Sequence, residues 1–265
     1  MTAIVPVSAD WLALREPADG RARSLPLARR AAALAGSPAV VHDLGSGTGS
    51  MMRWLAPHLD PRQSWVLHDW NDMLLDRAVE QHPVPGAVRT HVVDIARLQA
   101  ADLAGATLVT ASALLDVLTA DELAAIVEAC VAVGAPVLFA LSVVGRVQID
   151  PPDGDDGSFE AAFNAHQRRV VGGRRLLGPD GVGRARVLFA DAGWSVEETS
   201  TPWRLDATDG ALVTDWLDGW LDAAVEQRPE LASRAAASSE RRASHRDAGM
   251  LRVTVHHRDL LAWPP

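Results

Sequence analysis

The chain has 265 residues, of which 48% are hydrophobic, and a formal net charge of −9 at pH 7, which together predict one globular domain over residues 1–265. The negative charge argues against a broad nucleic-acid-binding surface, and no apolar run approaches the roughly 20 residues needed to cross a bilayer. All 25 basic residues are arginine and Cys130 is the single cysteine, which excludes lysine-dependent sites, an internal disulfide and a cysteine-rich zinc site.

Apolar and amphipathic segments alternate through the first half of the chain. The pattern predicts strands at residues 39–44, 64–69, 87–94, 106–112 and 136–144, and helices at 51–59, 72–81 and 120–133. Several of the strands are continuous β-branched runs, as expected for strands that are covered on both faces. The alternation predicts a doubly wound α/β fold.

The pattern loosens after the fifth strand. Helices are expected at 158–169 and 180–192, strands at 194–199 and 251–261, and two helical segments within 203–248. In the first of these segments Trp216 and Trp220 recur at helical spacing, opposite Asp215 and Asp218. This helix could form a dimer face or a substrate cap packed on the sheet, and we favour the cap.

A glycine-rich loop follows the first predicted strand. Asp43 ends the strand, and Gly45, Gly47 and Gly49 occupy every second position before a helix starts. Glycine permits positive φ and lets the backbone approach a ligand closely. The order strand, loop and helix predicts a nucleotide-like ligand at the carboxyl edge of a parallel sheet.

The run of motifs over residues 38–145 resembles the class I S-adenosylmethionine-dependent methyltransferases. Residues 43–49 match that family's acidic-x-Gly-x-Gly-x-Gly loop, and residues 66–74 and 92–94 resemble its second and third motifs. The resemblance implies a mostly parallel seven-stranded sheet with an antiparallel last strand, plus helical cap and insertion elements. A dinucleotide fingerprint would place glycine or alanine where Ser50 stands, so we favour S-adenosylmethionine as the cofactor.

The same resemblance divides the chain into segments. Residues 1–37 would form an N-terminal helical lid, 38–145 the cofactor-binding core, 146–180 a substrate lid, 181–202 the sixth-strand region, 203–248 a helical insertion and 249–265 the last strand. Two features depart from the family pattern. Thr107 stands where many members carry an aspartate, and roughly 45 extra residues separate the last two strands.

The resemblance also implies roles for individual residues. Asp69 would hold the two ribose hydroxyls and Asp94 would accept from the adenine amino group, although both could instead be strand-end acids or helix caps. Trp70 could pack against adenine or belong to the core. Arg23 or Arg15 could meet the methionine carboxylate. The candidate cofactor residues are Asp43, Gly45, Ser46, Gly47, Asp69, Trp70, Asp94, Ile95, Ser112 and Arg23.

Two side chains are candidates for a catalytic base. His166 follows the fifth strand, and Asp116 follows the fourth. A histidine side chain has an unperturbed pKa of about 6.5, which suits a proton acceptor at neutral pH. Either could instead be a residue without a catalytic role on its helix or loop. The candidate substrate-binding residues are Trp11, which could also anchor an N-terminal helix, and Arg15, Arg146 and Arg169, whose charges suit an anionic acceptor.

No metal site is expected. His256 and His257 are neighbours on a strand and point to opposite faces, and the acidic turn at residues 150–157 lacks the spacing of a calcium loop, so we expect a solvated turn. Cys130 lies in an alanine- and valine-rich helical stretch and is expected to be a buried, inert thiol.

The functional hypothesis is methyl transfer from S-adenosylmethionine to an oxygen, nitrogen or carbon atom of a small molecule, giving S-adenosylhomocysteine. A non-catalytic cofactor-binding sensor or assembly protein remains an alternative, as does an RNA methyltransferase, against which the acidic balance counts. We expect no nucleic-acid or membrane partner and leave a homodimer open. The start of the chain lacks a signal-peptide pattern, so a cytoplasmic location is expected.

Overall fold

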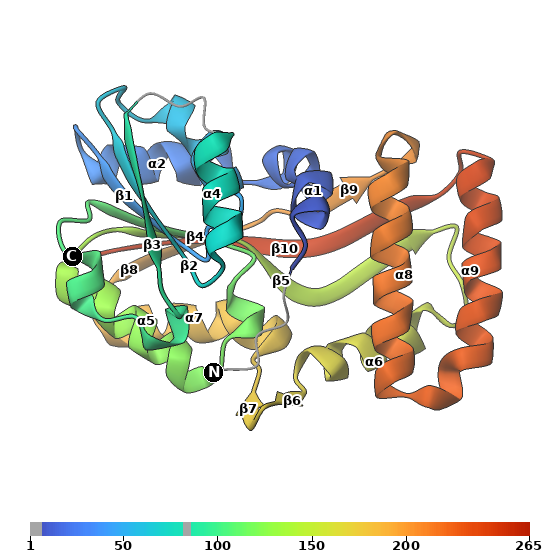
Figure 1. The fold of residues 1–265 in the computed structure, drawn as a ribbon. Coiled ribbons are helices and arrows are strands. Elements are labelled where there is room, and N and C mark those ends of the chain that lie inside the picture. Colours follow the sequence, from blue (N-terminus) through green and yellow to red (C-terminus); the bar gives the residue numbers. More distant parts are fainter. Residues whose placement is uncertain (1–6, 82–85) are drawn as a thin grey trace.

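A mixed β-sheet runs through the whole protein (Figure 1), whose computed structural model describes residues 7–81 and 86–265. The strand order is β3-β2-β1-β4-β5-β10-β8, and β9 also pairs with β10. The strands are β1 (Val40–Leu44), β2 (Ser64–Asp69), β3 (Ala87–Val92), β4 (Leu108–Ser112), β5 (Val137–Asp150), β8 (Ser195–Ser200), β9 (Trp203–Leu205) and β10 (Arg252–Trp263). Strands β1 to β5 pair in parallel, whereas β10 runs antiparallel to β5 and β8. The predicted fold class is confirmed. Additional short strands are β9 and a separate hairpin of β6 (Val170–Val171) and β7 (Arg174–Arg175).

Helices cover both faces of the sheet (Figure 1). One face carries α2 (Leu25–Ala35), α3 (Ser50–Leu55) and α4 (Asp72–Glu80), and the other carries α5 (Ala120–Val133) and α7 (Gly181–Asp191). Helix α5 has the bounds predicted from sequence because Thr119 and Glu122 form a capping box at its start and Gly134 adopts a left-handed conformation at its end.

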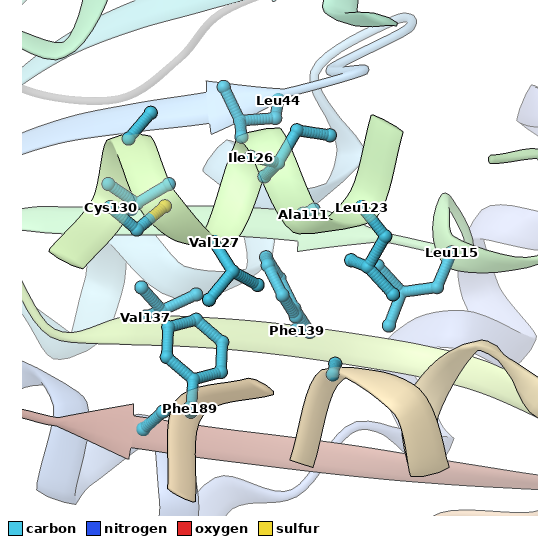
Figure 2. Close-up of a cluster of buried hydrophobic side chains, with 14 of the residues drawn as sticks. Leu44, Ala111, Leu115, Leu123, Ile126, Val127, Cys130, Val137, Phe139 and Phe189 are labelled. Carbon is cyan, nitrogen blue, oxygen red and sulfur yellow. The ribbon is translucent and has the colours of Figure 1, made fainter. Parts of the chain in front are cut away.

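Figure 2 shows the core beneath α5 and α7, where Val137 and Phe139 of β5 lie against Val127, Cys130 and Phe189. Phe139 and Phe189 are buried, and full burial of such a ring contributes about 2–3 kcal/mol. Burial also raises the pKa of the Cys130 thiol to about 12. The predicted burial of Cys130 is confirmed, and the raised pKa agrees with the expectation of an inert thiol.

Strands β5 and β10 extend beyond the other strands and carry a second group of helices (Figure 1). These helices are α6 (Asp156–Gln167), α8 (Gly210–Gln227) and α9 (Ala232–Asp247), which we call the cap. Trp220 of α8 is 2% exposed and packs edge-on against Phe159 of α6, with ring centroids 5.8 Å apart. Its indole is therefore part of the cap core and is not available for a dimer face.

The acidic turn before α6 is not a solvated loop, so that prediction is wrong. Asp153 accepts from Arg241 at 2.6 Å, Asp156 accepts from Arg242 at 2.6 Å, and Asp155 pairs with a third arginine of α9. Arg242 is 2% exposed. The partners lie 79 to 88 positions away in sequence, so local spacing could not reveal them.

The N-terminal segment forms two helices with different neighbours. Helix α1 (Ala9–Ala22), capped by Ser8, packs against β9 and α8, whereas α2 packs on the sheet. Residues 1–6 of the predicted N-terminal lid lie outside the described residues.

Within the described part of the chain, no helix is both long enough and apolar enough to cross a bilayer.

Candidate functional site

A cavity of about 440 Å³ opens at the carboxyl ends of β1, β2 and β4. Helices α1 and α6 contribute the opposite wall. The structure brings most of the sequence-predicted site residues to this cavity, namely Trp11, Arg15, Asp43, Gly45, Ser46, Gly47, Asp69, Trp70, Asp94, Ile95, Ser112, Asp116, His166 and Arg169. Arg23 and Arg146 are not among its lining residues.

The glycine loop needs its glycines. Gly45, Gly47 and Gly49 have φ values of 61°, 52° and 81°, in the left-handed region that other residues rarely adopt. A Cβ atom at Gly45 would lie 2.9 Å from a methyl group of Leu114. The loop therefore presents bare backbone to the cavity.

Asp69 ends β2 and is tied to the loop. Its carboxylate accepts from the Gly47 N–H at 2.8 Å and from the Asn71 N–H at 3.0 Å, one bond to each oxygen. The Trp70 backbone N–H also interacts with this carboxylate. An ionised carboxylate offers about four acceptor positions, so capacity remains for a ligand hydroxyl. Burial raises the pKa of Asp69, and the backbone N–H donors oppose that rise.

Asp43 presents a buried carboxylate to the same cavity. It is 1% exposed, its Oδ1 accepts from the Thr110 hydroxyl at 2.7 Å, and burial raises its pKa to about 7. The other carboxylate oxygen and the Ser46 hydroxyl have no hydrogen-bond partner among the described residues. Both residues line the cavity, so its wall is polar at this point.

Arg23 lies behind the loop. Its guanidinium donates to the Ser50 hydroxyl at 2.9 Å and to the Ser112 hydroxyl at 3.0 Å, and its side chain is 1% exposed. Burial lowers its pKa. This position differs from the predicted contact with the methionine carboxylate, because Arg23 instead ties the start of α3 to the end of β4.

Asp94 and Trp70 lie at the rim. Asp94 lines the cavity and also accepts from the Ala96 N–H at 3.1 Å, capping a short 3₁₀ helix (Ile95–Arg97). Trp70 is 41% exposed, so the alternative that it belongs to the core is wrong. Both side chains remain placed for contact with a ligand.

A second cavity, of about 390 Å³, adjoins the first. Arg146 lines this second cavity. Six residues line both cavities: Trp11, Arg15, Ala113, Asp116, Phe163 and Gln167. The shared residues mark the place where the two spaces meet.

Arg15 is held rigidly at this junction. It donates to both oxygens of Asp19, at 3.0 and 3.1 Å, and its guanidinium carbon lies 4.9 Å from the ring centroid of Trp203. The Trp203 indole N–H donates to the same carboxylate at 2.9 Å. Sequence reasoning missed both partners. Asp19 stands four residues after Arg15, a helical spacing that could have revealed it, whereas Trp203 lies 184 positions from Asp19 and left no local signal.

Asp116 also lies at the junction. Burial raises its pKa to about 6, and its side chain accepts no hydrogen bond from another residue of the described chain. Ala113, three residues earlier, has φ of 52°, a strained value for alanine that directs the segment after β4 toward the cavity.

His166 uses both ring nitrogens. Its Nε2 lies 3.1 Å from a carboxylate oxygen of Glu226 on α8, and its Nδ1 lies 3.1 Å from an Arg169 guanidinium nitrogen. Because the arginine can only donate, the Nδ1 accepts and the Nε2 carries the proton in the neutral ring. No lone pair of the neutral ring is then left to accept a further proton.

His256 and His257, which are adjacent on β10, contact protein side chains. His257 is 3% exposed and lies beside Trp203, with ring centroids 5.3 Å apart, and the His256 Nε2 lies 3.1 Å from the Gln148 side chain. Across residues 7–81 and 86–265, no three His, Cys, Asp or Glu side chains are grouped to hold a metal ion.

No protein-family model and no curated protein matches this sequence. Solved structures do match in fold. The cyclopropane synthase MmaA2 from Mycobacterium tuberculosis is 15% identical, with a TM-score of 0.52 over 97% of this chain and 94% of that one. The YcgJ protein from Bacillus subtilis is 11% identical, with a TM-score of 0.52 over 91% of this chain and 97% of that one.

A third structure is an O-methyltransferase family protein from Burkholderia thailandensis, 18% identical with a TM-score of 0.46 over 66% of this chain; the match spans 52% of that protein. The strand order and the antiparallel β10 agree with the fold expected from the sequence motifs. The chain has the class I methyltransferase fold. At these identities the likeness extends to the methyltransferase fold and not to a substrate.

Proposed function

We propose that this protein transfers a methyl group from S-adenosylmethionine to a small-molecule acceptor. The observation that carries the proposal is the position of Asp69. Its buried carboxylate accepts a hydrogen bond from the glycine loop and lines a cavity at the carboxyl ends of the strands. Asp43 and Ser46 support it as polar residues that line the same cavity, which suits a nucleoside with an amino acid tail.

The residues present fit the cofactor. Asp69 would accept from the ribose hydroxyls, Asp94 from the adenine amino group, and Trp70 would cover the base. The N–H groups of the glycine loop would donate to the methionine carboxylate of the cofactor. Asp43 would lie near the positively charged amino and sulfonium groups of the cofactor. Bound there, the cofactor supplies a methyl group activated by a positively charged sulfur.

The chain itself would orient the acceptor and take its proton. Arg15 and Trp203 form a rigid wall at the junction, and Phe163 and Trp11 cover the space between the cavities. Holding two reactants in line can recover roughly 7–11 kcal/mol of the barrier. Where the acceptor is a hydroxyl, the Asp116 carboxylate would receive its proton.

The test is incubation of the purified protein with methyl-labelled S-adenosylmethionine and a metabolite extract, with mass spectrometry to find the labelled product. Production of S-adenosylhomocysteine together with a labelled small molecule is expected. Cofactor binding without turnover would favour the sensor, and labelling of RNA alone would contradict the small-molecule acceptor. A protein that binds no S-adenosylmethionine at millimolar concentration would contradict the proposal altogether.

A further inference from the structure

The second cavity, which we call the tryptophan chamber, is lined by four of the nine tryptophans of the chain. Trp11 comes from α1, Trp203 from β9, and Trp216 and Trp220 from α8. The last two rings are stacked, with centroids 5.6 Å apart and planes 18° from parallel. Aromatic walls on several sides favour a flat, aromatic occupant, because offset stacking and edge contacts add to the burial of apolar area.

Buried polar atoms without partners gather around this chamber. Trp220 Nε1, His257 Nδ1, Asn164 Oδ1 and Gln167 Oε1 are buried without a hydrogen-bond partner in the described chain, and all four residues line the chamber. These atoms are shielded from the space of the chamber, but the side chains that carry them place polar groups among its indoles. The occupant is therefore expected to carry polar substituents.

The charges of the chamber favour a neutral occupant. The positive charge of Arg15 is neutralised by Asp19, to which it donates two hydrogen bonds. Arg146 and Asp215, both exposed, contribute opposite charges at the chamber wall. Asp116 remains at the junction with the cofactor cavity, where it can accept a hydrogen bond from a hydroxyl group.

From this geometry we infer that the tryptophan chamber binds a planar aromatic hydroxyl compound and presents its hydroxyl to Asp116; this inference rests on the proposed function for the identity of the methyl donor. In the reaction the hydroxyl oxygen bonds to the methyl carbon and its proton goes to the Asp116 carboxylate. The electron pair of the broken carbon–sulfur bond stays on sulfur, so the charges balance.

The test is binding, measured by calorimetry in the absence of cofactor. The probes are 2-naphthol and its saturated counterpart, decahydro-2-naphthol, which has a hydroxyl at the same position but no aromatic ring. We expect 2-naphthol to bind at least ten-fold more tightly. Equal affinities, or no binding of 2-naphthol at its solubility limit, would overturn the inference.

Two helical glycines give a matched pair of variants. Gly219 lines the chamber and Gly183 of α7 lines neither cavity, and an added Cβ would meet nothing within 4 Å at either position. Gly219→Phe should reduce 2-naphthol affinity at least ten-fold, whereas Gly183→Phe should change it less than two-fold. An unchanged affinity in folded Gly219→Phe would place the probe elsewhere and overturn the inference.

A further variant covers the case in which Gly219→Phe does not fold. Trp216→Leu removes one of the stacked, half-buried indoles, and it should also weaken 2-naphthol binding at least ten-fold. Calorimetry with S-adenosylmethionine separates the two proposals. Binding of 2-naphthol that depends on Trp216, without any cofactor binding, would retain the chamber and reject the methyl transfer. Cofactor binding and turnover without a preference for aromatic acceptors would retain the methyl transfer and reject the aromatic occupant of the chamber.

Discussion

The carboxyl group of Asp43 is buried and lacks a partner for one of its oxygens, and burial raises its pKa to about 7 from an ordinary value of 3.8. Between these two pH values the folded protein binds more protons at this site than the unfolded chain does. The contribution of Asp43 to the free energy of unfolding therefore falls as the pH rises from about 4 to 7.

Asp43→Asn should stabilise the cofactor-free protein at high pH, because it removes the cost of ionising a buried group. We expect the variant to exceed the wild type by on the order of 2 kcal/mol at pH 8, with the difference shrinking toward pH 4. Urea denaturation over that pH range measures it. A difference that does not change with pH would contradict this account of Asp43. Asp218→Asn, at an exposed position of α8, is the control.

Asp116 and His166 can be separated by their effect on turnover. Asp116→Asn should lower kcat about 100-fold for a hydroxyl acceptor, because it removes the proton acceptor, and should leave cofactor affinity within two-fold. Since the pKa of Asp116 is about 6, wild-type kcat should rise with pH and level off above about 7, and the variant should lose that rise.

His166→Gln is the comparison for this prediction. His166 links α6 to Glu226 of α8 and has no free lone pair, so its replacement should lower kcat much less than Asp116→Asn does. Steady-state kinetics with both variants decides between them. A greater loss in His166→Gln, with an unchanged pH profile in Asp116→Asn, would reverse the assignment.

At the scale of elements, α9 holds the cap together through its arginines. Arg242 has a side chain that is 3% exposed and donates to both oxygens of Asp156, at 2.6 and 2.8 Å. Removing one partner of a buried ion pair leaves the other charge without compensation.

The Asp156 side chain is 23% exposed, so water can partly compensate its charge, and Arg242→Ala should destabilise the protein by about 1.5–3 kcal/mol in urea denaturation. The control is Arg228→Ala, because Arg228 forms an exposed pair with Glu230 and its loss should cost within about 0.5 kcal/mol. Equal effects of the two substitutions would show that the α9 contacts do not hold the cap.

Element boundaries were predictable where the signals were local. Asn71 caps α4 and the Thr119 capping box starts α5, so both helices begin where the sequence predicts. Strand β5 was predicted to end at residue 144 but continues to Asp150, because its second half pairs with residues of β10 more than 100 positions later. Such long-range pairing leaves no local signal.

At the scale of the whole molecule, the sheet and the cap share β5 and β10 (Figure 1). Because the same two strands run through both cores, we expect them to unfold together. Far-ultraviolet circular dichroism, which follows the helices, and tryptophan fluorescence, which reports on both cores, should give coincident urea transitions. Two separated transitions would mean that the cap unfolds independently of the sheet.

The two halves of the site differed in how far sequence could predict them. The first cavity lies at the ends of neighbouring strands, so motif spacing and the family resemblance could place Asp43, Gly47 and Asp69 together. The tryptophan chamber draws its indoles from α1, β9 and α8, which only the folded chain brings together. Arg23 was predicted to meet the methionine carboxylate of the cofactor. Its burial behind the glycine loop could not be predicted from the sequence.

Calorimetric titration with S-adenosylmethionine tests the central claim most directly, using wild type, Asp69→Ala and, as a control, Asp72→Ala. Asp72 is the first residue of α4, its side chain accepts from the Met73 N–H, and it lines neither cavity. Asp69 would contribute two charge-assisted hydrogen bonds, so we expect micromolar wild-type binding, at least a 100-fold loss in folded Asp69→Ala and little change in Asp72→Ala. Absence of wild-type binding at millimolar cofactor, or equal affinity in Asp69→Ala, would contradict the assignment of this cavity as the cofactor site.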